Sequence, residues 1–262
     1  MKISIINKLS VLKMKQSGKV YLFFILISFL MASCQKDQFL GFAKSIGKTV
    51  TIDRPVDGNF TKIFLNDDVN LVITKGDAYS IKLEGGENLL PGIKTSVSDS
   101  MLTISNANTF NWLRSYDYVI TAYVTMPHIF VLEYKATSTV TNTDTIREDS
   151  LTVTSTGGSG YIDLVIKTGV SKLSITSGSA DMKISGTTGL NFIYSGSYGP
   201  FKCLGLKSDF LYMENASTND CYVNVKSHLE YKISGLGNIY YTGNPTEISG
   251  STTDAGRLIK YD

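Results

Sequence analysis

The chain has 262 residues, 42% of them hydrophobic and 18% charged, enough to bury the core of one large domain or two small ones. Its formal net charge of +2 depends on five lysines before Cys34, a stretch without acidic residues; the rest carries 20 basic and 23 acidic residues, a balance of −3. This balance, without a long basic run after Cys34, argues against a nucleic acid or an anionic membrane surface as the partner.

Residues 1–33 have the layout of a signal peptide. Lys13, Lys15 and Lys19 precede an apolar run from Val20 to Met31, which is too short to span a bilayer comfortably. The run ends in "LMASC", which resembles the lipobox of bacterial lipoproteins. The resemblance implies cleavage before Cys34 and acylation of its thiol and new amine, with fatty acids such as palmitate, giving a membrane anchor. A cleaved secretory signal with an unmodified Cys34 is the alternative.

Residues 34–55 have no sustained hydrophobic period, and we predict a tether that leads into the folded domain. Gln35 rather than Asp follows Cys34, so the inner-membrane retention signal of enterobacterial lipoproteins is missing. We therefore expect an outer-membrane lipoprotein of the cell envelope, either periplasmic or exposed at the cell surface. Met14 is an alternative start that would give a more compact signal peptide.

Residues 56–262 are predicted to form a single all-β domain, because apolar or β-branched residues recur at every second position. The less regular N-terminal part, residues 56–130, has five such segments, at 60–65, 69–76, 79–85, 93–105 and 117–127. "SDS", between Val97 and Met101, predicts a hairpin bend within the fourth segment. Pro127 should end the fifth segment, because proline cannot donate to a strand ladder.

Residues 131–262 repeat a phrase whose mean length is near 20. The phrase starts are Val131, Leu151, Leu173, Leu190, Leu211 and Leu229, and the successive intervals are 20, 22, 17, 21 and 18. Such intervals favour a parallel β-helix, a solenoid whose coils each carry short strands and bury a shared core by stacking. A flat meander is the alternative.

The five phrases from Leu151 on each contain a bend rich in serine, glycine or asparagine. The bends read "TGGSGYI", "SGSADM", "SGSYGPF", "ASTNDCY" and "SGLGNIY". Serine and threonine bond to local backbone, and glycine and asparagine tolerate a positive φ, so these residues suit corners of the chain. We expect the corners to stack along one edge of the solenoid.

These bends, with "ENLLPGIKTSVSDSMLTI" at Glu87–Ile104, resemble the head GIN domain family of auto-transporter adhesins over about Phe60 to Lys260. The Gly-Ile-Asn of the family name is replaced here by Asp68-Val69-Asn70, which keeps only the asparagine. The resemblance implies a β-helical protein at a Gram-negative envelope, frequently a lipoprotein. It implies no catalytic residue and no cofactor.

One stretch, "NTFNWLRSYDY", breaks the strand pattern and is predicted as a long loop. It carries the candidate ligand contacts Phe110, Trp112, Arg114 and Tyr116, because aromatic residues with an arginine are common at recognition sites. The favoured alternative is that these side chains cap one end of the solenoid, which stacked repeats require.

Cys203 and Cys221 are separated by close to one coil. If they occupied equivalent places on adjacent coils, a disulfide would be within reach in an oxidising envelope. Their offsets from the phrase starts differ, however, so free buried thiols are favoured.

No metal site is predicted. His128 and His228 are far apart in the chain, and neither has a second ligand at metal spacing, so both are expected at corners or on the surface. "GGSGYIDLV" has only one approximate copy of a calcium-binding repeat, which needs consecutive copies.

Two functions are compatible with this sequence. The first is a non-catalytic, lipid-anchored module that binds a carbohydrate or a surface protein, as an adhesin does. The second is a polysaccharide lyase or hydrolase on the same scaffold, since acids and lysines recur near the bends: Asp163, Asp181, Asp220, Lys183, Lys202 and Lys226. A structural role without an external ligand also stays open. Acids and bases converging on one face would favour the enzyme.

Overall fold

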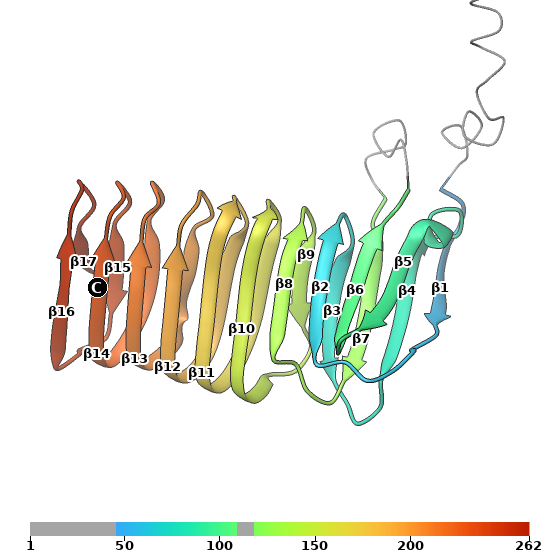
Figure 1. Ribbon diagram of the computed structural model, residues 1–262, viewed down its shortest axis with the longest axis horizontal. Coiled ribbons are helices and arrows are strands. Elements are labelled where there is room, and N and C mark those ends of the chain that lie inside the picture. Colours follow the sequence, from blue (N-terminus) through green and yellow to red (C-terminus); the bar gives the residue numbers. More distant parts are fainter. Residues whose placement is uncertain (1–45, 109–117, 262) are drawn as a thin grey trace, which may run out of the picture. The chain divides into compact units, whose positions relative to one another are not determined.

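The computed structural model describes residues 46–108 and 118–261, which form a parallel β-solenoid (Figure 1). This confirms the predicted all-β class and the β-helical architecture. The first strands are β1 (Thr49–Arg54), β2 (Lys62–Asp67), β3 (Asn70–Lys75), β4 (Ser80–Gly86), β5 (Ile93–Ser98), β6 (Met101–Asn106) and β7 (Thr121–Met126), with a 3-10 helix at Leu90–Gly92. The regular part has β8 (Val131–Ala136), β9 (Thr139–Asn142), β10 (Ile146–Gly158), β11 (Tyr161–Gly178), β12 (Asp181–Ser195), β13 (Phe201–Asn215), β14 (Cys221–Ile233), β15 (Ile239–Thr242), β16 (Glu247–Thr252) and β17 (Leu258–Lys260).

Two faces run along the solenoid. Face A contains β6, β2, β8, the C-terminal halves of β10 to β14, and β16, all paired in parallel. Face B contains β7, β3, β9, the N-terminal halves of β11 to β14, β15 and β17. Each of β11 to β14 therefore runs along face B, turns at the lower edge in Figure 1, and continues along face A.

The coil period is more regular than the phrase starts suggest. Strand register stacks Leu151, Ser171, Asn191, Leu211, Leu229 and Ile248 on one another, so every coil is close to the predicted mean length. Leu173 instead pairs with Val153, and Leu190 with Val170, so these two phrase starts were displaced from the true register. The apolar pattern alone could not align them, because polar Ser171 and Asn191 are buried in this column.

The serine- and glycine-rich bends stack at the upper edge in Figure 1, as predicted. The amide of Ser179 donates to Gly158 O at 2.8 Å, that of Tyr198 to Gly178 O at 3.1 Å, and that of Ser234 to Asn215 O at 2.9 Å. Gly178 has a φ of +85°, and a Cβ there would lie 2.2 Å from Gly158 O. Small residues are thus needed because the bends lie directly against each other.

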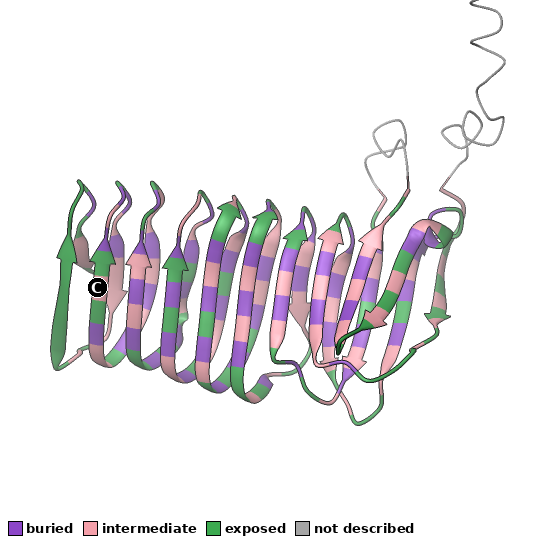
Figure 2. Cartoon of the chain, in the orientation of Figure 1, coloured by how far each residue is buried: buried purple, intermediate pink, exposed green. Residues whose placement is uncertain are grey.

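The core lies between the two faces, and alternate residues along the strands are buried (Figure 2). It is mainly apolar, but near the lower turn a buried chain of hydrogen bonds joins three coils. Ser171 Oγ bonds to Thr188 Oγ1 at 3.1 Å and to Asn191 Oδ1 at 2.8 Å, and Asn191 Nδ2 donates to Ser208 Oγ at 3.0 Å. These partners satisfy polar groups that would otherwise be costly to bury.

The N-terminal part does not follow chain order. β2 pairs with β6 on one side and with the much later strand β8 on the other. β1 pairs antiparallel with β4, so the last residues of the segment predicted as tether form a strand. β5 and β6 form the predicted hairpin, with Asp99 and Ser100 at φ +52° and +60°. β7 ends directly before Pro127, as expected.

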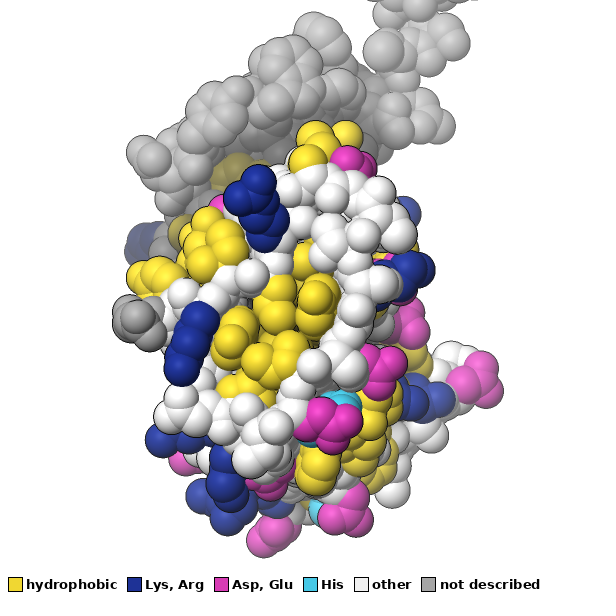
Figure 3. All heavy atoms as spheres, turned by 90° about the vertical axis from the view of Figure 1, so that its left-hand side faces the viewer, with side chains coloured by type: hydrophobic (Ala, Val, Ile, Leu, Met, Phe, Trp, Pro, Cys, Tyr) yellow, Lys and Arg dark blue, Asp and Glu magenta, His cyan; other side chains and the backbone are white. Residues whose placement is uncertain are grey.

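The other end of the solenoid is formed by β16 and β17. Figure 3 looks onto this end, where hydrophobic side chains fill the centre within a rim of backbone and polar groups. Every residue of β16 is exposed, including Ile248 at 42%. No helix in the described residues is long and apolar enough to cross a membrane.

Candidate functional site

Several predicted sites lie outside the described residues. These are the lipidation site Cys34 and the candidate ligand contacts Phe110, Trp112, Arg114 and Tyr116. Both stay predictions.

The two C-terminal cysteines are buried free thiols, without a disulfide between them. Strand register places Cys221 beside Phe201, so Cys203 lies two residues further along the neighbouring strand. Burial raises the pKa of Cys203 to about 12 and that of Cys221 to about 11. Both thiols therefore stay protonated at neutral pH and are poor nucleophiles.

The acids and lysines considered for an enzyme are mostly paired between neighbouring coils. The pairs are Lys183–Asp163 (Nζ–Oδ2 2.9 Å), Lys202–Asp181, and Lys226–Asp209 (Nζ–Oδ1 3.5 Å). Asp220 Oδ1 accepts the amide of Asn238 at 2.8 Å. The recurrence of acids near the bends thus has a structural origin, in coil-to-coil pairing.

The two histidines each face one glutamate. His128 Nδ1 lies 3.1 Å from Glu148 Oε2, and His228 Nδ1 lies 3.1 Å from Glu247 Oε2. Within residues 46–108 and 118–261, no three His, Cys, Asp or Glu side chains are grouped closely enough to hold a metal ion.

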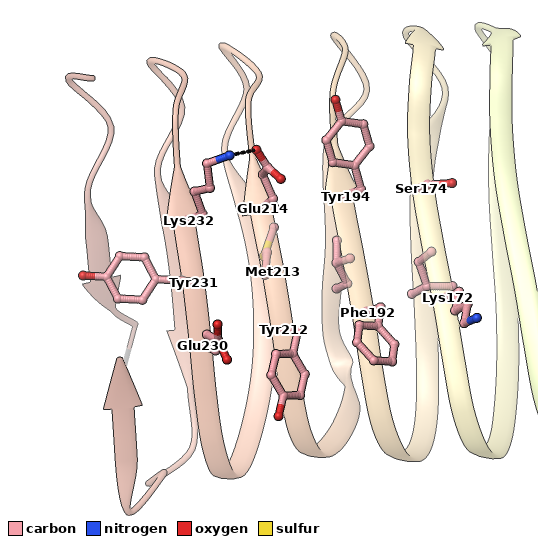
Figure 4. A pocket seen from close by; sticks show the side chains of 12 residues that line it. Lys172, Ser174, Phe192, Tyr194, Tyr212, Met213, Glu214, Glu230, Tyr231 and Lys232 are labelled. Carbon is pink, nitrogen blue, oxygen red and sulfur yellow. Dashed lines mark hydrogen bonds and ion pairs between the residues drawn. The ribbon is translucent and has the colours of Figure 1, made fainter. Parts of the chain in front are cut away.

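A groove of about 380 Å³ lies on face A, across β11 to β14 (Figure 4). We call it the aromatic groove. Two outward-facing columns of side chains form it, each with one residue per coil. The first column is Lys172, Phe192, Tyr212 and Glu230; the second is Ser174, Tyr194, Glu214 and Lys232.

Aromatic rings occupy the centre of the groove. The rings of Phe192 and Tyr212 stack with centroids 5.3 Å apart and planes at 22°. Tyr194 lies over Gly196, where a Cβ would come within 2.5 Å of the tyrosine ring. Beside them, Phe210 packs against His228, with centroids 6.4 Å apart. Phe192, Tyr194 and Phe210 nevertheless stay 38%, 41% and 47% exposed, which is unusual for a cluster of large rings.

Charged side chains flank the rings. Lys232 Nζ donates to Glu214 Oε1 at 2.7 Å, and this bond raises the pKa of Lys232. Lys172 and Glu230 have no ion-pair partner in the described part of the chain. The groove therefore offers rings at its centre and one available charge of each sign at its two ends.

A family model described as "Putative auto-transporter adhesin, head GIN domain" matches residues 59–245. The chain belongs to this head GIN domain family. No curated protein sequence matches it significantly.

Solved structures share the fold of this head GIN domain. A putative adhesin from Bacteroides fragilis aligns with a TM-score of 0.75 and 21% identity, covering 82% of this chain and 97% of that one. A putative adhesin from Parabacteroides merdae aligns at 0.63 and 14% identity, covering 83% and 98%. A putative lipid binding protein from Parabacteroides distasonis aligns at 0.65 and 18% identity, covering 82% and 98%.

The asparagine retained from the family's triplet joins two neighbouring coils of the head GIN domain that are far apart in the sequence. Asn70 Oδ1 accepts the amide of Thr139 at 2.9 Å, and the preceding Val69 O accepts Ser138 Oγ at 2.6 Å. Both bonds connect the β2–β3 coil to the β8–β9 coil, so this position has a structural role here.

The repeated phrases of the sequence did not predict the aromatic groove. A signal was present, because Lys172, Phe192 and Tyr212 recur at the spacing of one coil. The phrase starts Leu173 and Leu190 are closer together than one coil. Aligning the phrases at these starts therefore does not place Lys172 beside Phe192.

Proposed function

We propose that the protein is a non-catalytic binding module of the cell envelope, anchored through a lipid on Cys34, that holds a carbohydrate or protein partner in the aromatic groove. The exposed ring cluster on face A is the observation that carries this proposal. Large rings of this kind supply most of the binding energy at recognition sites. The adhesin description of the family and of several structural neighbours agrees with it.

The shape of the groove suits an extended partner. It is shallow, open along face A, and bordered by Ser174, Glu230 and Lys232, which can bond to hydroxyl or backbone groups. The polysaccharide-enzyme alternative has less support, because the lysines considered for it bond to neighbouring acids. Retaining and inverting glycosidases need two carboxyl groups, not held in ion pairs, on either side of the glycosidic bond that is cut.

Removing the rings tests the groove. We expect the Phe192→Ala, Tyr194→Ala double variant of residues 35–262 to lose at least about tenfold in affinity for any glycan or surface protein that the wild-type chain captures, because hot-spot rings are each worth about 2 kcal/mol or more. Glycan-array binding and pull-down from envelope extracts measure it.

The matched control is Tyr240→Ala. Tyr240 stacks on Tyr222 at 5.0 Å, but lies on face B, away from the groove. Equal binding by the wild type and the face A variant, with loss in the Tyr240 variant, would place the site on the other face and refute the proposal.

The anchor has its own test. Cys34→Ala should abolish incorporation of radiolabelled palmitate, because it removes the thiol that carries the acyl chains of the anchor. A protein that carries no label in wild-type form would refute lipidation while leaving the groove untouched.

A further inference from the structure

We propose that the partner held in the aromatic groove is a second copy of this chain, bound face A to face A about a two-fold axis. This inference rests on the proposed function, since it names the occupant of the same groove. It comes from the order of side chains along the groove.

The first column of the groove is self-complementary. Along the solenoid it reads Lys172, Phe192, Tyr212, Glu230, that is, cation, ring, ring, anion. A two-fold axis that lies in the interface, parallel to the strands and midway between β12 and β13, reverses this order in the second copy. Lys172 of one copy then meets Glu230 of the other, Phe192 meets Tyr212, and the same contacts form again in reverse. A two-fold interface requires this property, because the same patch serves both subunits.

The two charges cannot satisfy each other within one chain. Three strand spacings of about 4.8 Å separate Lys172 from Glu230, roughly 14 Å in total. In the dimer each charge instead faces the opposite charge of the reversed copy. The pair of copies therefore gains two ion pairs, which also steer their approach.

The flanking side chains obey the same symmetry. Tyr194 on β12 and Glu214 on β13 occupy equivalent places in the second column, so the axis brings the hydroxyl of Tyr194 to the Glu214 carboxylate of the other copy. Leu190 and Phe210 are likewise register partners, on the opposite side of the first column. The axis places Phe210, which is 47% exposed, against Leu190 of the other copy, and both become covered.

This pairing of faces agrees with the general geometry of sheet packing. Two sheets pack face to face about 10 Å apart, with side chains interdigitating between them. Phe192 stacks on Tyr212, and Phe210 packs against His228 at a tilt, so these side chains lose little freedom on contact. The interface closes after two copies and does not propagate.

Charge reversal tests the geometry. Sedimentation velocity of residues 35–262 should show a dimer for the wild type, and Lys172→Glu and Glu230→Lys should each raise the dimer dissociation constant at least about tenfold by placing like charges in contact. An equimolar mixture of the two single variants should recover the dimer, because the introduced carboxylate at position 172 then meets the introduced ammonium at position 230. The doubly reversed variant should recover it as well.

Lys207→Glu is the matched control, since Lys207 is an exposed lysine of β13, a strand between β11 and β14, but lies outside the aromatic groove. It should dimerise like the wild type. A wild type that stays monomeric at high micromolar concentration overturns the dimer. So does a mixture that fails to recover it, or equal loss in the Lys207 variant. If the monomeric protein still captures a glycan through Phe192 and Tyr194, the proposed function stands and only this inference falls.

Discussion

Replacing Phe201 by alanine is expected to lower the free energy of unfolding by about 3–5 kcal/mol. Phe201 is fully buried, and register places it between Met182 and Cys221 of the adjacent coils. The cavity cannot close easily, because backbone ladders hold each coil to both of its neighbours. Urea unfolding followed by circular dichroism measures the change.

Phe130→Ala is the control for this result. Phe130 is 39% exposed and should change the stability by less than about 1 kcal/mol. Because stacked coils depend on nearest-neighbour interfaces, the Phe201 variant should also unfold over a broader urea range. Equal effects of the two variants would show that the core does not run through β13.

Replacing Gly186 by alanine is expected to cost about 2–6 kcal/mol of stability, the sum of two effects. Gly186 has a φ of +109°, which costs an alanine about 1–3 kcal/mol. A Cβ there would also lie 2.0 Å from Ile166 O, a backbone atom of β11 that cannot move without breaking the ladder. Forcing the strands apart adds about 1–3 kcal/mol.

Gly157→Ala separates the two causes. Gly157 has nearly the same φ, +107°, but the nearest atom to an added Cβ is Lys135 Cγ at 3.7 Å. This variant should lose only the backbone part, so thermal and urea unfolding should rank it clearly above the Gly186 variant. A reversed order would contradict the close packing of β11 against β12.

Much of the fold could be predicted because its signals are local. Alternating apolar residues indicate which side of a strand faces the core. Pro127 indicates where a strand ends, and Asp99 indicates a turn between two strands. The serine- and glycine-rich bends indicated the coil length, since each coil needs one. The antiparallel β1–β4 pairing and the insertion of β2 between β6 and β8 left no such local signal.

The candidate site depended on register. In the sequence, nothing distinguishes Phe192, Tyr212 and Phe210 from other strand residues. They lie side by side only because the register aligns their strands on neighbouring coils. Polar Ser171 and Asn191 interrupt the apolar column, so hydrophobicity alone misplaced two coils by one or two residues. A shift of one residue sends a side chain to the opposite face.

The sequence by itself determined the strand class, the parallel coils, the bends and the family, because these follow from periodicity and from residues that tolerate a tight turn. Only the tertiary structure decided which outward side chains share a surface. Contacts between coils join residues that are a whole coil apart in the chain. They are made through backbone hydrogen bonds, which are the same for every residue type and so leave no pattern in the sequence. The aromatic groove and its order of charges therefore became visible only when the coils were stacked.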